Sequence, residues 1–226
     1  MTELATRRFA SRPALESALE ERLARAIAAP TAAALMLSGG NTPLPAYRAL
    51  AARPGLAAAA GLRVLFSDDR YVPADSPASN YHRTAPLLAA LALPSAAVLR
   101  VRTELPLENA ARDYEDQLAA LLRSGTRIGL GLLGLGADGH TASLFGAADL
   151  ERARGRLALA VHRPDGMSAV SVTPELLARL AEPVFVVAGA DKQAAVERLL
   201  AQDPGLTAWR AVQGCERVEL WVASSD

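Results

Sequence analysis

Short apolar runs alternate with longer amphipathic segments along this chain. Between residues 13 and 28 apolar side chains recur every four positions, a spacing that places them on one face of a helix. These side chains are Leu15, Leu19, Leu23 and Ile27. The run at 32–37 is apolar without a break and stops before two glycines, which predicts a buried strand. Thr42 and Pro43 are residue types of a helix N-cap and first helical position, and they predict a helix to about residue 51.

The rest of the chain repeats this alternation. The same patterns predict strands at 63–67, 98–101, 128–133, 157–161, 169–173, 183–187 and 217–222, and helices at 107–122, 174–180 and 192–200. Alternating strands and helices favour an α/β fold with a mainly parallel, Rossmann-like sheet that helices cover on both faces. Pro-Asp-Gly at 164–166 predicts a turn that joins a small additional strand pair. No linker or repeat interrupts the pattern, so we expect a single domain over residues 1–226.

Composition and charge narrow the classes of partner. The chain carries 24 basic and 24 acidic residues, so no global field attracts nucleic acid or an acidic membrane. Cys215 is the only cysteine, which makes an internal disulfide impossible. No apolar run approaches the roughly 20 residues that span a bilayer, and the N-terminus lacks the apolar stretch of a signal peptide. We therefore expect a soluble cytoplasmic protein without nucleic-acid or membrane partners, and a monomer as its default state.

Two loops that follow predicted strands contain residues suited to an anionic ligand. Gly39 and Gly40 let the backbone approach a ligand, and the helix start after them presents free N–H groups; a plain tight turn is the alternative. Asp68-Asp69-Arg70 follows the next strand, and the loop runs on to Asn80. These charges form either a surface ion-pair cluster or a phosphate clamp in which a carboxylate orients the fork of Arg70.

A third loop contains three glycines and a histidine. Gly134, Gly136 and Gly139 fit G-x-G-x-x-G, the fingerprint of dinucleotide sites. However, His140 follows the third glycine where the fingerprint requires the start of a packed helix, which disfavours a nicotinamide or flavin site. With Asp138 two residues away, His140 is a candidate general base at neutral pH. The spacing of the three histidines matches no usual zinc pattern, so we expect no metal.

Together these loops resemble the 6-phosphogluconolactonase family. The matching segments are Leu-Ser-Gly-Gly-Asn-Thr-Pro at 37–43, Asp-Asp-Arg-Tyr-Val-Pro at 68–73 with Ser-Asn at 79–80, Gly-Leu-Gly-Ala-Asp-Gly-His-Thr-Ala-Ser-Leu-Phe at 134–145, and Gly-Ala-Asp-Lys at 189–192. They occur in the family's order and with its spacing. The resemblance implies the fold that this family shares with glucosamine-6-phosphate deaminases and ribose-5-phosphate isomerase. It also implies hydrolysis of 6-phospho-D-glucono-1,5-lactone to 6-phosphogluconate in the oxidative pentose phosphate pathway, without a cofactor.

The resemblance also implies roles for residues at the matching positions. His140 is the implied base that activates water, and Asp138 orients its imidazole or stabilises the charged form. Arg70 and Lys192 are the implied residues that hold the phosphate and so orient the lactone. The other implied substrate contacts are Gly39, Gly40, Asn41, Thr42, Asp68 and Asn80.

Two other functions stay open. A glucosamine-6-phosphate deaminase-like isomerase shares the Asp-Gly-His turn, but those enzymes carry Asn-Glu-Pro after the histidine, where this chain has Ser-Leu-Phe-Gly at 143–146. A sugar-phosphate sensor without turnover is kept open by Ala169, which stands where the lactonases typically have arginine. The positive group is then missing, unless Arg163 reaches the substrate from the preceding turn.

Overall fold

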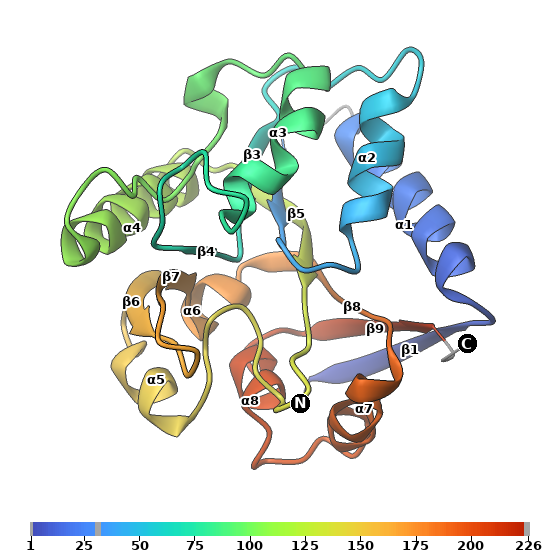
Figure 1. Cartoon of the computed structure of the whole chain (residues 1–226), viewed down its shortest axis with the longest axis vertical. Coiled ribbons are helices and arrows are strands. Elements are labelled where there is room, and N and C mark those ends of the chain that lie inside the picture. Colours follow the sequence, from blue (N-terminus) through green and yellow to red (C-terminus); the bar gives the residue numbers. More distant parts are fainter. Residues whose placement is uncertain (1, 30–32, 224–226) are drawn as a thin grey trace.

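Six parallel strands form the central sheet of the protein in a computed structural model, which describes residues 2–29 and 33–223 (Figure 1). Across the sheet they lie in the order β1-β9-β8-β5-β2-β3. Their bounds are Glu3–Phe9 for β1, Arg217–Ala223 for β9, Leu180–Val187 for β8, Arg127–Leu133 for β5, Ala33–Leu37 for β2 and Arg63–Phe66 for β3. Strand β2 is the apolar run predicted at 32–37, of which residue 32 lies outside the described residues. The expected mainly parallel α/β fold is confirmed.

Helices cover both faces of this sheet and enclose two hydrophobic cores. One core contains side chains of α1 (Arg12–Ile27), α2 (Leu44–Ala52) and α3 (Asn80–Ala90). The other contains side chains of α4 (Leu107–Arg123), α5 (Ala147–Arg152), α6 (Pro174–Leu177), α7 (Gln193–Leu200) and α8 (Thr207–Val212). Successive residues of β2 alternate between the two cores, which explains its unbroken apolar sequence. None of the helices in the described ranges combines the length and the hydropathy that crossing a bilayer requires.

A second, antiparallel sheet has three strands instead of the predicted two. Strands β4 (Asp68–Arg70), β7 (Ser168–Val172) and β6 (Ala158–His162) lie in that order. The sequence predicted the β6–β7 pair but not β4, whose Asp-Asp-Arg has no strand propensity. Ser67 ties β4 to both sheets, because its N–H donates to the Leu37 carbonyl and its carbonyl accepts from the Val172 N–H, each at 2.9 Å.

Three further predictions were wrong in detail. Segment 98–101 is not a strand: after the 3₁₀ turn Ser95–Ala97, only Val98 pairs with β3. The helix predicted from Thr42 begins at Leu44 without a side-chain cap, because its N-cap residue is Pro43, whose side chain has no hydrogen-bond acceptor. The helix predicted to residue 180 ends at Leu177, because the next residues enter β8 and pair with β5.

The order of the strands reverses beside β2. After β2 the chain continues to β3 on one side, whereas β5, β8, β9 and β1 lie on the other. In open parallel sheets ligands bind beyond the carboxyl ends of the strands at such a reversal. The loops after β2 and β5 leave the sheet at this point, and β8 is the neighbour of β5. The topology therefore brings together the glycine loops that the sequence singled out.

Candidate active site

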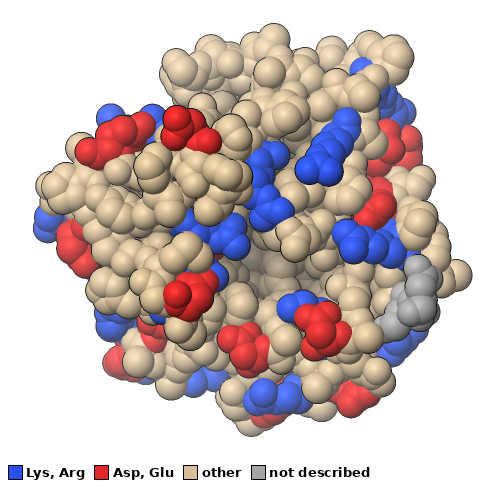
Figure 2. Space-filling view, in the orientation of Figure 1, with Lys and Arg blue, Asp and Glu red and all other residues tan. Residues whose placement is uncertain are grey.

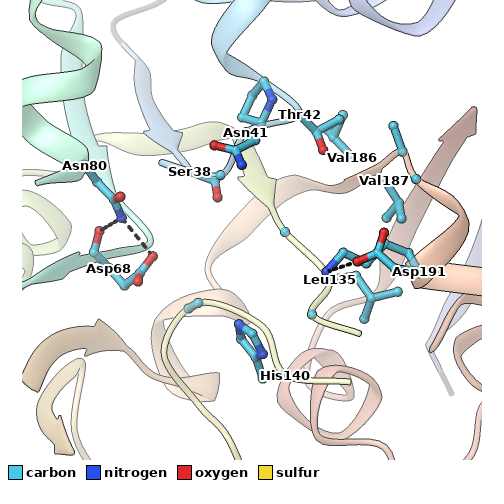
Figure 3. A pocket seen from close by; sticks show the side chains of 18 of the residues that line it. Ser38, Asn41, Thr42, Asp68, Asn80, Leu135, His140, Val186, Val187 and Asp191 are labelled. Atoms are coloured by element: carbon cyan, nitrogen blue, oxygen red, sulfur yellow. Dashed lines mark hydrogen bonds and ion pairs between the residues drawn. The ribbon is translucent and has the colours of Figure 1, made fainter. Parts of the chain in front are cut away.

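A polar cavity of about 420 Å³ opens where the strand order reverses (Figure 3). Its size lies within the range of small-ligand sites, roughly 300–1,000 Å³. Of the ten residues singled out from the sequence, eight line it: Gly40, Asn41, Thr42, Asp68, Arg70, Asn80, His140 and Lys192. The other two lie directly behind the lining, Gly39 against Asn80 and Asp138 against His140. Segments distant in the sequence thus meet in one cavity, while the role of each residue stays a prediction.

The loop at 38–43 leaves β2 with unpaired backbone donors. Tyr47 of α2 holds its start, since the Tyr47 hydroxyl donates to the Ser38 carbonyl at 3.0 Å and accepts from the Ser38 N–H at 3.3 Å. The backbone amides of Gly40 and Asn41 donate to no atom within residues 2–29 and 33–223. Helix α2 begins directly after the loop with the positive end of its dipole. This combination suits an anionic oxygen.

Asn80, the first residue of α3, connects three parts of the site. Its Nδ2 donates to the Asp68 carbonyl at 2.8 Å, and its Oδ1 accepts from Arg70 Nη1 at 2.5 Å. Asn80 also packs so tightly on Gly39 that a Cβ there would lie 1.9 Å from Asn80 Oδ1. Arg70 Nη1 donates in addition to the Ala78 carbonyl at 3.3 Å, which holds the guanidinium from one side. Arg70 Nε is buried and has no partner among the described residues.

Asp69 lies buried beneath this corner, with 1% of its surface exposed. Its carboxylate accepts hydrogen bonds from the N–H of Asn80 at 2.6 Å, the N–H of Tyr81 at 3.1 Å and the hydroxyl of Ser79 at 3.1 Å. Burial, and to a smaller extent the charge of Asp68, raise the pKa of Asp69 to about 6, although these hydrogen bonds lower it. Asp69 is therefore a structural group that anchors the first turn of α3 under the cavity.

Asp138 and His140 form a pair at the wall of the cavity. Oδ1 of Asp138 lies 2.5 Å from His140 Nδ1 and accepts from the His140 backbone N–H at 3.2 Å. Burial alone raises the pKa of Asp138, but the hydrogen bonds from His140 outweigh it and hold that pKa below its ordinary value. Asp138 is thus an ionised acceptor at neutral pH, which favours the tautomer of His140 that carries its proton on Nδ1. The His140 side chain is 26% exposed and lines the cavity, and the centroid of its ring lies 4.5 Å from that of Phe145. A partly exposed imidazole at this place is consistent with the predicted general base.

The glycines of this loop serve the His–Asp pair. A Cβ at Gly136 would lie 2.0 Å from His140 Nδ1 and 2.4 Å from Asp138 Oδ1, so only glycine leaves room for the pair. Gly139 has φ +86°, a conformation that L side chains rarely adopt. The turn runs on to residue 146, and α5 begins only at Ala147. Because a dinucleotide fingerprint needs a helix at its third glycine, this geometry does not fit one.

Arg163 lies on the same side of the cavity as Ala169, the position at which the lactonases typically have arginine. In the small sheet Ala169 is the partner of both Arg70 in β4 and Val161 in β6, so these three side chains share one face. Arg163 follows Val161 by two residues and lines the cavity together with Arg70. Its side chain is 11% exposed, and its Nη1 donates to the Ser143 hydroxyl at 3.2 Å. Arg163 thus reaches the cavity from the turn, which is the possibility that the sequence had left open.

Positive charge dominates the lining. The cationic side chains are Arg12, Arg70, Arg163 and Lys192, and the carboxylates are Asp68 and Asp191. Lys192 ends the 3₁₀ turn Ala190–Lys192, and its Nζ lies 3.2 Å from Asp191 Oδ2. Figure 2 shows basic side chains around the hollow on this face. Carboxylates outside the lining pair with two of these cations, Glu16 with Arg12 at 2.7 Å and Asp165 with Arg163 at 2.8 Å. Arg70 has no ion-pair partner among the described residues, so its charge in particular favours an anionic ligand. Within the described ranges no three His, Cys, Asp or Glu side chains gather as metal ligands would.

Sequence reasoning missed two residues that shape the cavity. Arg12, the first residue of α1, lines it and donates to the Asn41 carbonyl at 3.4 Å. No signal distinguishes Arg12 from an ordinary arginine at a helix start. Ser143 is buried, and its hydroxyl donates to Asp68 Oδ2 at 2.7 Å, so it joins the β5 loop to β4. Its place three residues after His140 in a matching segment was a usable signal.

Known proteins match the chain along most of its length. A family model described as glucosamine-6-phosphate isomerases/6-phosphogluconolactonase matches residues 8–221. A 6-phosphogluconolactonase of Synechocystis sp. is 38% identical over 189 residues, which cover 80% of this chain and 77% of that protein. Another from Mesorhizobium japonicum is 38% identical over 213 residues, 87% of this chain and 85% of that protein. The crystal structure of a 6-phosphogluconolactonase from Thermotoga maritima superposes with a TM-score of 0.79 at 28% identity and covers 99% of this chain and 100% of its own.

Proposed function

The chain belongs to the family of glucosamine-6-phosphate isomerases and 6-phosphogluconolactonases, and within that family we propose that it is a lactonase. It hydrolyses 6-phospho-D-glucono-1,5-lactone to 6-phospho-D-gluconate, a step of the oxidative pentose phosphate pathway, without a cofactor. The relatives that are 38% identical and named 6-phosphogluconolactonase support this reaction. The observation that carries the assignment is the single cavity in which His140 meets Arg70 and Lys192. The cytoplasmic location and the monomeric state stay predictions.

His140 acts as the general base. Its Nε2 takes a proton from water as the water oxygen attacks C1 of the lactone, a contribution of roughly 10²- to 10⁴-fold. Asp138 accepts from Nδ1, holds the ring in place and stabilises the imidazolium. When the carbonyl re-forms, the bond between C1 and the ring oxygen breaks, and the imidazolium returns the proton to that oxygen. One water is added, and the resulting carboxylic acid ionises at neutral pH.

The cationic side of the cavity holds the phosphate. Arg70 offers a forked guanidinium that Asn80 fixes from one side, and Lys192 offers a point charge beside Asp191. Arg163, which Asp165 holds in place, adds a third cationic side chain from the turn after β6 on the side where Ala169 has none. Fixing the phosphate several atoms from C1 orients the lactone for attack.

As water attacks C1, negative charge develops on the carbonyl oxygen of the lactone. The free N–H groups of the 38–43 loop supply donors for an anionic oxygen, with Thr42 beside them in the lining. Asp68 and Asn80 complete the lining next to Arg70, and Gly39 lets Asn80 approach the loop.

Generating the lactone in situ tests this function directly. The protein is expected to accelerate loss of the lactone above its spontaneous decay in buffer. Release of ammonia from glucosamine 6-phosphate without faster lactone loss would assign a deaminase instead. Binding of 6-phosphogluconate without any acceleration would assign a sensor.

Substitution of Arg70 tests the assigned orientation of the substrate. Arg70→Met is expected to raise KM for the phosphorylated lactone, because the fork that reads the phosphate is lost, and to leave δ-gluconolactone turnover nearly unchanged. Arg112→Met, on the exposed face of α4, is the matched control and should change neither. An equal loss on both lactones would show that Arg70 does not read the phosphate.

A further inference from the structure

We propose that Arg83 is a positioning residue of this site, because it fixes the orientation of two amides whose N–H groups bind an anionic oxygen of the substrate. The inference rests on the proposed lactonase function and deepens it. Arg83 belongs to α3 and does not itself line the cavity. It acts through the loop at 38–43.

Arg83 binds this loop with both arms of its guanidinium. Nη1 donates to the Gly39 carbonyl at 2.6 Å, and Nη2 donates to Oδ1 of Asn41 at 2.5 Å. A planar fork that engages two acceptors fixes their relative position, which a single point charge does not do. The backbone and a side chain of the same loop are therefore held together by one residue.

These contacts dictate where the corresponding N–H groups point. In a trans peptide the C=O and the N–H lie on opposite sides, and the carbonyl of Gly39 shares a peptide with the N–H of Gly40. Because Arg83 holds that carbonyl, the Gly40 N–H is turned away from Arg83, and Gly40 lines the cavity. The side-chain amide of Asn41 is turned in the same way, since Oδ1 on Arg83 leaves Nδ2 and its two protons on the other side. Figure 3 shows Asn41 at the rim of the cavity beside Ser38 and Thr42.

The Gly39–Gly40 peptide needs such a restraint. Residue 39 has to be glycine, because a Cβ would lie 1.9 Å from Asn80 Oδ1. Two successive glycines accept either sign of φ, so the peptide between them has little intrinsic preference for one orientation. Asn80 and Arg83 are three residues apart and therefore lie on the same face of α3. Asn80 requires the glycine, and Arg83 restrains the peptide that the glycine leaves free.

The surroundings of Arg83 disfavour a positive charge on its guanidinium. Burial lowers the pKa of Arg83, and the charges of Arg70 and Arg48 lower it further. The guanidinium nevertheless donates to the two loop oxygens at 2.6 and 2.5 Å. A cation on a peptide carbonyl also polarises that peptide, which strengthens its N–H as a donor. Arg83 thus orients the Gly40 N–H and makes it a better partner for negative charge.

Three variants separate positioning from simple charge. Arg83→Met removes both hydrogen bonds and the charge, and Arg83→Lys keeps the charge without the fork. Arg48→Met is the matched control, because Arg48 is exposed on α2 and influences Arg83 through its charge alone. We expect kcat/KM on the phosphorylated lactone to fall at least tenfold in Arg83→Met and by less in Arg83→Lys. Arg48→Met should stay within about twofold of the native rate, since a screened surface charge contributes little.

The split between KM and kcat identifies the bound oxygen. A rise in KM restricted to the phosphorylated lactone assigns the donors to the phosphate, whereas a fall in kcat on both this lactone and δ-gluconolactone assigns them to the carbonyl oxygen. Either result supports the positioning role. Unchanged kinetics in folded Arg83→Met or Arg83→Lys, or equal losses in Arg83→Met and Arg48→Met, overturn it while lactonase activity stands. A native protein that does not accelerate lactone loss overturns the proposed function itself.

Discussion

Two aspartates of the site meet opposite environments. Asp69 lies 1% exposed beneath α3, accepts three hydrogen bonds, and has its pKa raised to about 6 by burial. Asp138 has a side chain 55% exposed, contacts His140, and has a pKa below the ordinary value. Asp69 is bound only by uncharged donors of its own corner, which indicates a structural anchor, whereas the contact of Asp138 with an imidazole in the cavity supports the proposed role in the chemistry.

The same contrast extends to the segments around the two carboxylates. The corner of β4 and α3 is a buried network in which Asp69 anchors Asn80 and Asn80 in turn holds Arg70. The turn after β5 is an open loop in which glycine leaves room for the His140–Asp138 pair. Changes in the corner are expected to act through stability and substrate binding, and changes in the turn through the rate of the chemical step.

Removal of the base is the largest expected effect. His140→Asn should lower kcat by roughly 10²- to 10⁴-fold, because no second imidazole lines the cavity among the described residues, and should leave binding of 6-phosphogluconate nearly intact. Steady-state kinetics on lactone generated in situ measure the first effect, and calorimetric titration measures the second. His162→Asn, on the exposed end of β6, is the matched control with an unchanged rate. Near-native turnover in His140→Asn would eliminate the residue as the base.

Deleting each aspartate tests the comparison itself. Asp69→Ala leaves the N–H groups of Asn80 and Tyr81 without their acceptor, and the free energy of unfolding should fall by about 2–3 kcal/mol. Asp138→Ala should cost clearly less stability but lower kcat, because the tautomer and orientation of His140 are no longer held. Urea unfolding and kinetics of both variants provide the measurements. Equal losses of stability would refute the division between anchor and chemistry.

The first glycine loop offers a sharper steric test. Gly39→Ala places a Cβ 1.9 Å from Asn80 Oδ1, so the loop or α3 has to shift, and the unfolding free energy should fall by about 1–3 kcal/mol. Gly40→Ala is the matched control, because its nearest neighbour, Pro43 Cδ, is 3.9 Å away. Thermal melting of the two variants should therefore differ. If both melt alike, the close approach of Asn80 to the loop is wrong.

The smallest expected effect is the pH dependence of the anchor. The pKa of Asp69 is about 6 in the folded protein and about 3.9 in an unfolded chain, so the folded state binds more protons between these values. The proton-linked part of its contribution to stability is therefore fully present below about pH 4 and is lost as pH rises through 6, whereas the hydrogen bonds that it accepts persist in the ionised form. The stability of the native protein relative to Asp69→Asn should decrease by about 1 kcal/mol between pH 5 and pH 7. A flat or rising difference would contradict the raised pKa.

Much of the fold could be predicted because its apolar spacing is local. The four-residue stripe of α1 is fully buried, and the continuous apolar runs became β2 and β5 between two cores. Strand β1 was missed because Glu-Leu-Ala-Thr-Arg-Arg-Phe is largely polar. It is a strand because all seven of its residues pair with β9 at the edge of the sheet. Helix α3 was also missed, since it contains Pro86 and begins in the polar segment Ser-Asn.

For the site, the sequence determined the residue types and the loops that carry them. Glycines, carboxylates, cations and one histidine follow three apolar strands, and the order of these segments indicated the family. Only the tertiary structure decided which of them touch: the contact of Asp138 with His140, the fork of Arg83 on Gly39 and Asn41, and the approach of Arg163. The physical reason is that hydrophobic periodicity acts over a few residues, whereas a hydrogen bond depends on positions set to a few tenths of an ångström by strands and helices distant in the sequence.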